Sequence, residues 1–381
     1  MAAPGNAPIA VALEGISDTG VVPTERLLAA MLGASTKVSD LIFSPGRPPQ
    51  IEVHGQLVAV EVNELKQLSA DDTRRIAADL IGNNKQAITT LREQGSADVS
   101  YGIAGLARFR VNVFIQRGSC AVVMRVIPTT IPDFSTLHLP SQLADVANVR
   151  HGIVLVTGST SSGKSSTLAA LLDRINTDHS LHIITVEDPI EFLHNHKRCT
   201  VHQRELHSDT PDFAMALRAA MRQSPRVIFV GEVRDREMMQ TVLEAAESGH
   251  LVLSSMNTVD AAKTVDRIVG TFASSEQQGV RERLAKNFRY IICQRLLPRA
   301  NRDGRVPAVE ILKSTPRTRE IVETGERPGK TILDAIKAGE ADGMQHFDSE
   351  IAKLVRTGLV DLETGLAYAS NPTVLGQELA R

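Results

Sequence analysis

A phosphate-binding motif stands in the middle of the chain. Gly158–Ser165 fits the pattern G-x-x-x-x-G-K-[ST], after the apolar run Ile153–Val156 and before the helical pattern Ser166–Ile175. Glycines let the backbone curl so that its N–H groups face inward, and a helix start adds positive potential. The motif predicts a loop in which Lys164 binds the β- and γ-phosphates of ATP and the Ser165 hydroxyl binds Mg²⁺. The residues expected to bind nucleotide are Gly158, Ser159, Thr160, Ser161, Ser162, Gly163, Lys164, Ser165 and Ser166.

Two acidic residues end apolar runs further along the chain. Val227–Val230 is followed by Gly231 and Glu232, an arrangement in which a strand delivers a carboxylate to magnesium. Glu187 stands just before Pro189, which cannot continue a strand ladder. Ligands bind at strand ends in open α/β sheets, so we expect Glu187 to orient and polarise an attacking water. A solvated acidic turn is the alternative.

Ala107–Ile127 is predicted to form a β-hairpin with a two-residue turn at Arg117-Gly118. The register creates an apolar core face of Phe109, Val111, Val113, Ile115, Cys120, Val122, Met124 and Val126. On the other face it places Arg110 opposite Arg125. Like charges directly opposite each other are unfavourable, so the pair indicates a bound anion. A solvated basic face is the alternative.

The pattern of elements predicts two domains. A small α+β domain is expected over residues 24–137, with a helix over Thr24–Leu32 and a second helix capped by Ser69. Alternating strands and helices over residues 151–371 predict a parallel sheet, with the last part helical. Its strand candidates are Ile153–Val156, His182–Val186, Val227–Val230 and Leu251–Ser254. Residues 1–23 are expected to be a flexible leader, 138–150 a linker and 372–381 a polar tail.

Composition excludes several classes of protein. The net charge of −2, 3% aromatic residues and absence of Trp argue against a nucleic-acid partner. The three cysteines form no C-x-x-C pair, which argues against a four-thiolate zinc site and against a disulfide framework. No apolar stretch is long enough to span a membrane, and the first residues lack the charged region of a signal peptide. A reduced cytoplasmic compartment is therefore expected.

Taken together, these segments resemble the secretion ATPase superfamily, and within it the type IV pilus retraction ATPases. The resemblance covers roughly Lys37 to Pro372. The order of the VEDPIE, VGEVRD and QRLLPR blocks is highly specific. The stretches that carry it are ARFRVNVFIQRG, GSTSSGKSSTLAALLDRIN, HIITVEDPIEFLH, VHQRE, FAMALRAAMRQSPRVIFVGEVRD, ESGHLVLSSMNT, AAKTVDRIV, CQRLLPR and FDSEIAKLVRTGLV.

The resemblance implies an α/β fold: a RecA-like P-loop ATPase core with a smaller α+β PAS-like N-terminal domain. It matches Glu187 to the family's catalytic glutamate and Glu232 to its Walker-B glutamate, a ligand of Mg²⁺. Arg110 and Arg125 match paired arginines that reach the nucleotide phosphates. The implied protein is a Mg²⁺-dependent ATPase, a homo-hexameric motor that drives pilus retraction in twitching motility. It would work in the cytoplasm at the inner-membrane base of the pilus, with a platform protein and a paralogous ATPase as partners.

Several positions depart from the family pattern. The family's histidine box normally has two histidines seven residues apart, and here the two positions are His250 and Asn257, both candidate catalytic residues. Asparagine can hydrogen-bond a phosphate but cannot carry a proton, while a single histidine is usually structural. Ser161 replaces a usual glycine, with little effect expected, and Arg226 a usual aspartate. These departures suggest a divergent paralogue.

Three alternative functions stay open on the sequence. One is a ring subunit that binds nucleotide but barely hydrolyses it, and another is a secretion-system ATPase that moves proteins. A small-molecule kinase is the most distant, because it would need an acceptor pocket. The lack of C-x-x-C pairs argues against the pilus assembly ATPases, which carry a tetracysteine zinc element.

Overall fold

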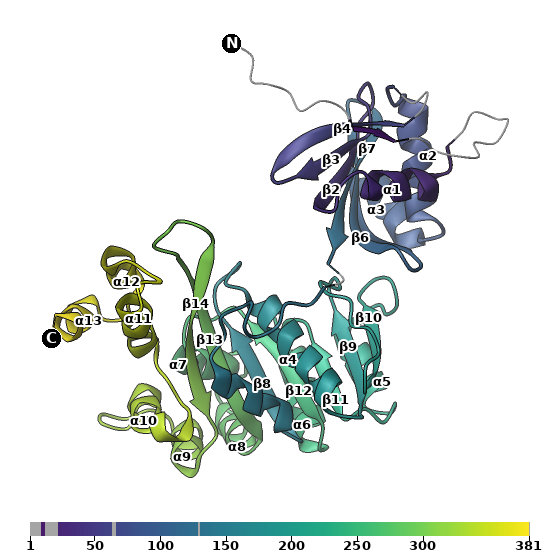
Figure 1. Ribbon diagram of the computed structural model, residues 1–381. Coiled ribbons are helices and arrows are strands. Elements are labelled where there is room, and N and C mark those ends of the chain that lie inside the picture. Colours follow the sequence, from purple (N-terminus) through teal and green to yellow (C-terminus); the bar gives the residue numbers. More distant parts are fainter. Residues whose placement is uncertain (1–8, 12–21, 63–65, 129, 381) are drawn as a thin grey trace. The chain divides into compact units, whose positions relative to one another are not determined.

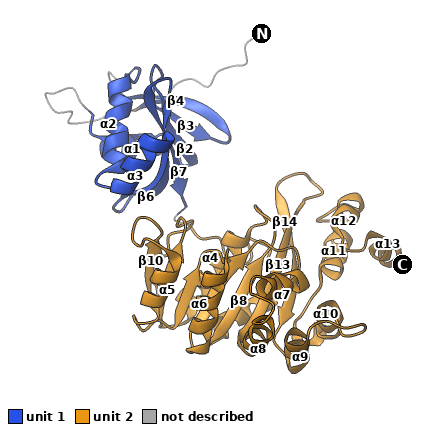
Figure 2. Ribbon diagram, turned by 180° about the vertical axis from the view of Figure 1, so that it is seen from behind, with its two compact units in different colours: residues 1–129 blue, residues 130–381 orange. Residues whose placement is uncertain are grey.

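The chain folds into two compact units, residues 1–129 and 130–381 (Figure 2). The structure, a computed structural model, describes residues 9–11, 22–62, 66–128 and 130–380. Each unit is built on its own seven-stranded sheet.

The first unit is an α+β domain with helices on one face of its sheet (Figure 1). Its strands run in the order β1-β4-β3-β2-β7-β6-β5, and all neighbours are antiparallel except β1 and β4. The elements are β1 (Ile9–Val11), α1 (Thr24–Gly33), β2 (Val38–Phe43), β3 (Gln50–Val53), β4 (Gln56–Val62), α2 (Ala70–Ile81), α3 (Lys85–Gln94), β5 (Ser96–Ile103), β6 (Ala107–Gln116) and β7 (Ser119–Ile127).

The expected hairpin and its register are confirmed. Arg110 pairs with Arg125 across β6 and β7, and Val111 pairs with Met124 on the buried face. Toward the turn that face becomes exposed, since Ile115 keeps 45% of its surface in solvent. The cap at Ser69 is also confirmed. The Ser69 hydroxyl accepts a hydrogen bond from the Asp72 N–H in the first turn of α2.

The second unit is a three-layer α/β domain. Its strands run in the order β10-β9-β11-β12-β8-β13-β14, and only β14 is antiparallel to its neighbour. The elements are η1 (Ser141–Asn148), β8 (Gly152–Thr157), α4 (Lys164–Asp178), β9 (His182–Glu187), β10 (Thr200–Glu205), α5 (Phe213–Ala220), β11 (Val227–Val230), α6 (Arg236–Glu247), β12 (Leu251–Met256), α7 (Ala261–Gly270), α8 (Gln277–Asn287), β13 (Phe288–Pro298), β14 (Arg305–Lys313), α9 (Pro316–Thr324), α10 (Ile332–Ala338), η2 (Glu340–Asp342), α11 (Phe347–Arg356), α12 (Leu362–Tyr368) and α13 (Pro372–Leu379).

The central strands β8 and β12 are buried along their whole length because helices cover both faces of the sheet. Ile153 and Leu155 of β8 pack into a core with α6, α7 and α8. Val154 and Val156 point the other way, into a core with α4 and η1. Burial on both faces is typical of parallel sheets and explains the short apolar runs of the sequence. The expected RecA-like α/β core is confirmed.

Three segments differ from what their sequences predicted. Ile9–Val11, within the expected leader, pairs with β4, while most of residues 1–23 lie outside the described part of the chain. The expected linker 138–150 contains η1, whose Leu143 is fully buried against the core of the second unit. The expected tail forms α13, because Leu375 is fully buried between neighbouring helices.

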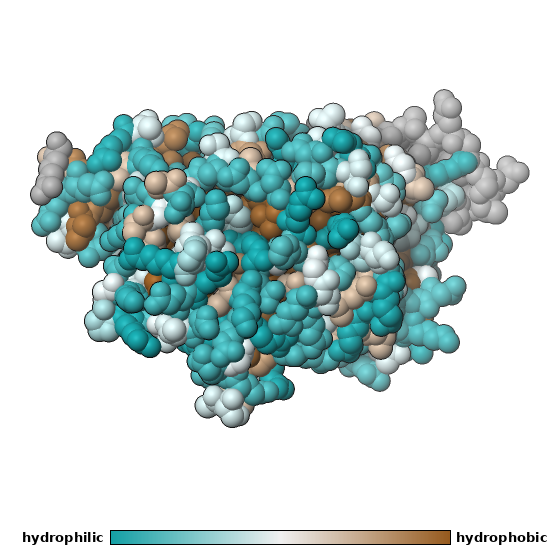
Figure 3. Space-filling model, turned by 90° about the horizontal axis from the view of Figure 1, so that it is seen from below, coloured by the Kyte–Doolittle hydropathy of each residue, from teal (hydrophilic) through white to brown (hydrophobic). Residues whose placement is uncertain are grey.

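No helix in the described part of the chain is both long enough and apolar enough to cross a membrane. On the face shown in Figure 3, hydrophobic residues lie in small groups among hydrophilic ones. Scattered exposure of this kind is ordinary for a protein surface.

Candidate functional site

Four neighbouring strands of the second unit end at one edge of the sheet. The loop 158–163 follows β8, and Asn257 follows β12, the strand beside it. Glu232 follows β11 and Glu187 ends β9, the next two strands in order. Since parallel strands deliver their carboxyl ends to the same edge, the fold brings these predicted residues together.

The loop has its shape because β13 packs directly against its glycines. A Cβ on Gly158 would lie 2.4 Å from the Gln294 carbonyl oxygen, and one on Gly163 would lie 2.6 Å from the Gln294 side-chain nitrogen. Gly163 also has φ of +89°, which a side chain disfavours. Ser161 adopts φ of +62°, a left-handed conformation that costs a residue with a side chain about 1 kcal/mol.

Gln294 joins three elements around the loop. Gln294 is 3% exposed, and both the oxygen and the nitrogen of its side-chain amide are hydrogen-bonded. Its Oε1 accepts from the Thr167 hydroxyl of α4 at 2.7 Å, and its Nε2 donates to the Ser162 carbonyl at 2.7 Å. Sequence reasoning missed Gln294; the available signal was a polar residue inside the largely apolar strand of the QRLLPR block.

Lys164 and Ser165 begin α4 and face the edge where the acids gather. The Lys164 ammonium donates to the carbonyls of Gly158 at 3.0 Å and Ser159 at 2.8 Å. Partial burial lowers the pKa of Lys164, and the nearby Glu232 and Glu191 oppose that shift. The Ser165 hydroxyl donates to Glu191 at 2.9 Å. Glu191 was not predicted as a site residue, although it closes the VEDPIE block.

Glu232 is held from two sides. The Asn257 amide donates to Glu232 Oε1. Arg234 contacts the other Glu232 oxygen at 3.3 Å and Asp188 at 3.2 Å, so it bridges the ends of β11 and β9. Arg234 had no role in the prediction. These contacts hold the Glu232 carboxylate near Lys164, whose charged form it stabilises.

Glu187 is buried, which excludes the solvated acidic turn. Its side chain is 5% exposed and accepts hydrogen bonds from the Thr185 hydroxyl at 2.7 Å and the Gln203 amide at 3.0 Å. Burial raises its pKa to about 7, against the effect of these two donors. A carboxyl with this pKa exchanges its proton readily near neutral pH.

His250 lies at the opposite edge of the sheet. It precedes β12, whereas Asn257 follows it, and six extended residues at roughly 3.3 Å each separate the two by about 20 Å. Its Nδ1 lies 2.9 Å from the Ala245 carbonyl at the end of α6. Within the chain, His250 and Asn257 therefore lie at opposite ends of β12.

Arg110 and Arg125 lie opposite each other in the first unit, as expected. The Arg125 Nε donates to Asp40 of β2 at 3.0 Å, and Asp40 is only 6% exposed. Arg110 makes no hydrogen bond or ion pair with any described residue. Asp40 thus balances the charge of Arg125, and the charge of Arg110 is left without a carboxylate partner among the described residues. Asp40 was missed because it lies on a strand far away in sequence.

The donors near the loop fit a magnesium ion. Mg²⁺ prefers carboxylate, hydroxyl and phosphate oxygens and keeps several waters. The Ser165 hydroxyl and the Glu232 carboxylate, with Glu191 beside Ser165, supply groups of this kind.

The buried Thr167–Gln294 hydrogen bond can be tested by an isosteric change. Thr167→Val leaves Gln294 Oε1 without its donor, and an unpaired buried acceptor costs about 1–3 kcal/mol. We expect the free energy of unfolding of the second unit to fall by that amount in urea denaturation. Thr167→Ser, which keeps the hydroxyl, is the control and should lose less. Equal stability of the Val and Ser variants would contradict the assignment.

Glu187 also predicts how stability depends on pH. The unfolded chain releases this proton near 4.5 and the folded chain near 7, so between these values the folded state binds more protons. Stability should therefore fall as pH rises from about 5 to 7.5, and Glu187→Gln should flatten the fall. Burial raises the pKa of Glu310 to about 7 as well, so part of the slope should remain. Urea denaturation at several pH values measures this, and a variant with the full slope would refute it.

Comparison with known proteins agrees with this geometry. The family model described as "Type II/IV secretion system protein" matches residues 51–348. A twitching motility protein of Neisseria gonorrhoeae is 40% identical over 85% of this chain and 84% of its own length. The type IV pilus retraction ATPase PilT of Pseudomonas aeruginosa is 40% identical over 91% of this chain and 98% of its own.

A solved structure agrees with the sequence relatives. The crystal structure of the pilus retraction motor PilT with bound ADP aligns with a TM-score of 0.79 at 37% identity, covering 94% of this chain and 99% of that one. The loop, the two strand-end glutamates and the two-unit architecture are thus accompanied by similarity along nearly the whole chain. The chain belongs to the type II/IV secretion system protein family and, within it, to the pilus retraction ATPases.

Proposed function

We propose that this chain hydrolyses ATP to ADP and phosphate and that its turnover drives the retraction of a type IV pilus. The observation that carries the proposal is the meeting of the loop 158–163 with Glu187 and Glu232 at one sheet edge. It is supported by the names of the relatives, a twitching motility protein and a retraction ATPase, and by the ADP bound in the similar structure.

The chemistry is in-line attack of water on the γ-phosphate. The loop amides and Lys164 would stabilise the negative charge of the phosphates. To do so, Lys164 would leave the Gly158 and Ser159 carbonyls and donate to phosphate oxygens instead. Glu187 would accept the proton of the attacking water, since a base with a pKa near the working pH is effective. Ser165 and Glu232 would hold Mg²⁺, which would supply positive charge close to the phosphates.

Two further groups complete the proposed site. Asn257 donates to Glu232 and keeps that carboxylate in place, but its amide cannot shuttle a proton. Arg110 and Arg125 would contact the phosphates, as their incompletely neutralised charge supports. We assign His250 no contact with the nucleotide bound to its own chain.

The assembly is also a proposal. We expect a homo-hexameric ring at the cytoplasmic side of the inner-membrane base of the pilus, with the platform protein and a paralogous ATPase as partners. ATP binding and hydrolysis would change the angle between the domains and so produce displacement. The second candidate is a nucleotide-binding regulatory subunit of the same machine, which Asn257 in place of a histidine favours.

Two substitutions test the catalytic assignment. Lys164→Ala should abolish phosphate release, because it removes the cation on the β- and γ-phosphates. Glu187→Ala should retain bound ATP without turning it over, which filter binding of labelled ATP measures. Lys286→Ala, an exposed lysine at the end of α8, is the control and should hydrolyse normally. Normal turnover in either site variant would overturn the assignment.

Asn257→His tests the alternative of a weakly hydrolysing subunit. An imidazole beside Glu232 can carry a proton, so we expect kcat for phosphate release to rise about tenfold or more. Asn257→Gln keeps the amide chemistry and should show no gain. If the histidine variant hydrolyses ATP at the unchanged rate, asparagine suffices and the regulatory alternative loses its support.

A further inference from the structure

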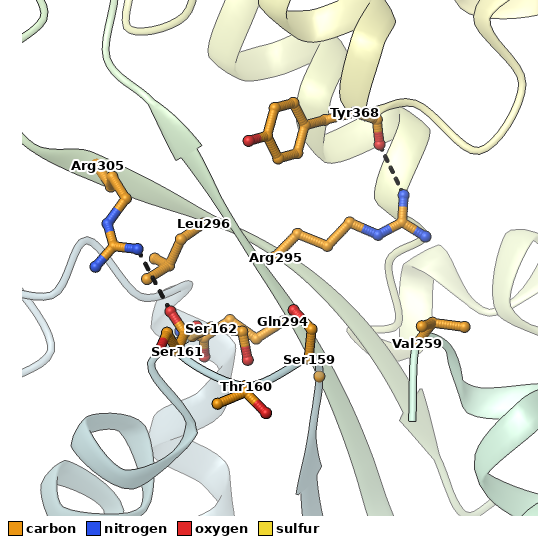
Figure 4. A pocket seen from close by; sticks show the side chains of 11 residues that line it. Ser159, Thr160, Ser161, Ser162, Val259, Gln294, Arg295, Leu296, Arg305 and Tyr368 are labelled. Atoms are coloured by element: carbon orange, nitrogen blue, oxygen red, sulfur yellow. Dashed lines mark hydrogen bonds between the residues drawn. The ribbon is translucent and has the colours of Figure 1, made fainter. Parts of the chain in front are cut away.

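Pockets lie at both ends of the central strands of the second unit. The one beside the phosphate-binding loop is lined by the loop residues 158–162 (Figure 4) and belongs to the site described above. The other, of about 350 Å³, lies where β8, β9, β11 and β12 begin. β8, β9 and β12 are each six residues long, so about 20 Å of extended chain separates the two ends. The second pocket is therefore not part of the phosphate site.

The floor of this second pocket is apolar. Val227 and Leu251, the first residues of β11 and β12, are each 1% exposed, and Ala147 of η1 is also buried. Val149 and Leu181 are partly buried and complete the apolar lining. A mostly apolar hollow of this volume is typical of sites for small ligands. It offers a place out of water for a hydrocarbon or aromatic group.

The polar groups of the second pocket are neutral or basic. They belong to Asn148, Arg150, His179 and Arg226, and none of the described residues that line the pocket carries a carboxylate. The side chains of Arg150 and Arg226 make no hydrogen bond or ion pair with any residue in the described part of the chain. The Nε2 of His179 is buried without a hydrogen-bond partner. The pocket therefore presents unbalanced positive charge above an apolar floor.

The backbone fixes the position of Arg226 at this pocket. The Arg226 N–H donates to the His182 carbonyl of β9 at 2.9 Å, and the Arg226 carbonyl accepts from the Leu251 N–H of β12 at 3.0 Å. Both partners are the first residues of their strands. The arginine is thus held between two strands of the sheet and does not sit on a free loop.

Capping of helix ends does not account for the two arginines. Basic side chains often lie at the C-terminal ends of helices, where they bind free carbonyls, and η1 and α4 both end near this pocket. At the end of α4, however, Arg198 donates to the Asp178 carbonyl at 2.9 Å, and Arg174 pairs with the Asp178 carboxylate. Arg150 and Arg226 donate to no carbonyl of the described residues.

We propose that this pocket binds a small phosphate monoester, with the phosphate on Arg150 and Arg226 and an apolar group on Val227 and Leu251. A guanidinium group presents paired N–H donors that match two phosphate oxygens. A phosphate monoester carries nearly two negative charges at pH 7, which matches two guanidinium groups, whereas a carboxylate carries one. The site goes beyond the proposed function and does not depend on it.

Calorimetric titration of the full chain with phenyl phosphate tests the proposal. Saturating Mg-ADP is present throughout to occupy the phosphate-binding loop. We expect one phenyl phosphate to bind per chain. Inorganic phosphate should bind about tenfold more weakly, because it lacks the ring that the apolar floor would remove from water. Benzyl alcohol, which has the ring without the charge, should give no measurable heat of binding.

Substitution of the arginines locates the probe. Arg226→Ala and Arg150→Ala should each weaken phenyl phosphate binding by about tenfold or more, because each removes hydrogen bonds to a charged group. Arg226→Lys keeps the charge but loses the paired donors, so its affinity should lie between those of the wild type and Arg226→Ala. Arg222→Ala is the matched control, since Arg222 is exposed and does not line the pocket. It should bind like the wild type.

Lys164→Ala separates the two sites. This variant should bind phenyl phosphate like the wild type, because Lys164 lies at the other end of the strands. Loss of binding in Lys164→Ala would place the probe in the phosphate-binding loop and overturn the proposal. Wild-type affinity in Arg226→Ala, or a wild-type chain that does not bind phenyl phosphate, would overturn it as well. The proposed ATPase function is tested separately, by phosphate release, and none of these outcomes decides it.

Discussion

The contact between β13 and the glycines of the phosphate-binding loop is the constraint on which the site depends. Gly158 and Gly163 leave no room for side chains because the Gln294 backbone and amide occupy that space. The same amide ties the loop to α4 through Thr167. The loop is thereby held in shape from behind, and its N–H groups need little reorganisation to receive phosphates.

The charged groups around the loop are held by neighbours rather than free in solvent. Arg234 and Asn257 orient Glu232, Glu191 receives the Ser165 hydroxyl, and Glu187 is buried with two hydrogen-bond donors. Such support fixes geometry, which is what transition-state stabilisation requires. Burial of Glu187 raises its pKa because it disfavours the ionised form. The ionised form that would accept a proton in catalysis is therefore also the form that lowers the stability of the fold.

Local patterns made much of the fold and part of the site predictable. The register of β6 and β7 follows from turn length and alternation, and the four central parallel strands follow from short apolar runs. Contacts between distant segments were not predictable: Gln294 lies on a strand far from the loop, and Asp40 reaches Arg125 from another strand. The spacing of His250 and Asn257 did not show that the strand β12 lies between them and places them at its opposite ends.

The central claim is that the backbone amides after β8 receive the nucleotide phosphates. Backbone ¹⁵N–¹H spectra of the full chain, recorded with and without Mg-ADP, test it most directly. We expect large shifts for the amides of residues 159–165 and small ones for the amides around His250 at the far edge of the sheet. Bound ADP that leaves the amides of 159–165 unshifted would contradict it.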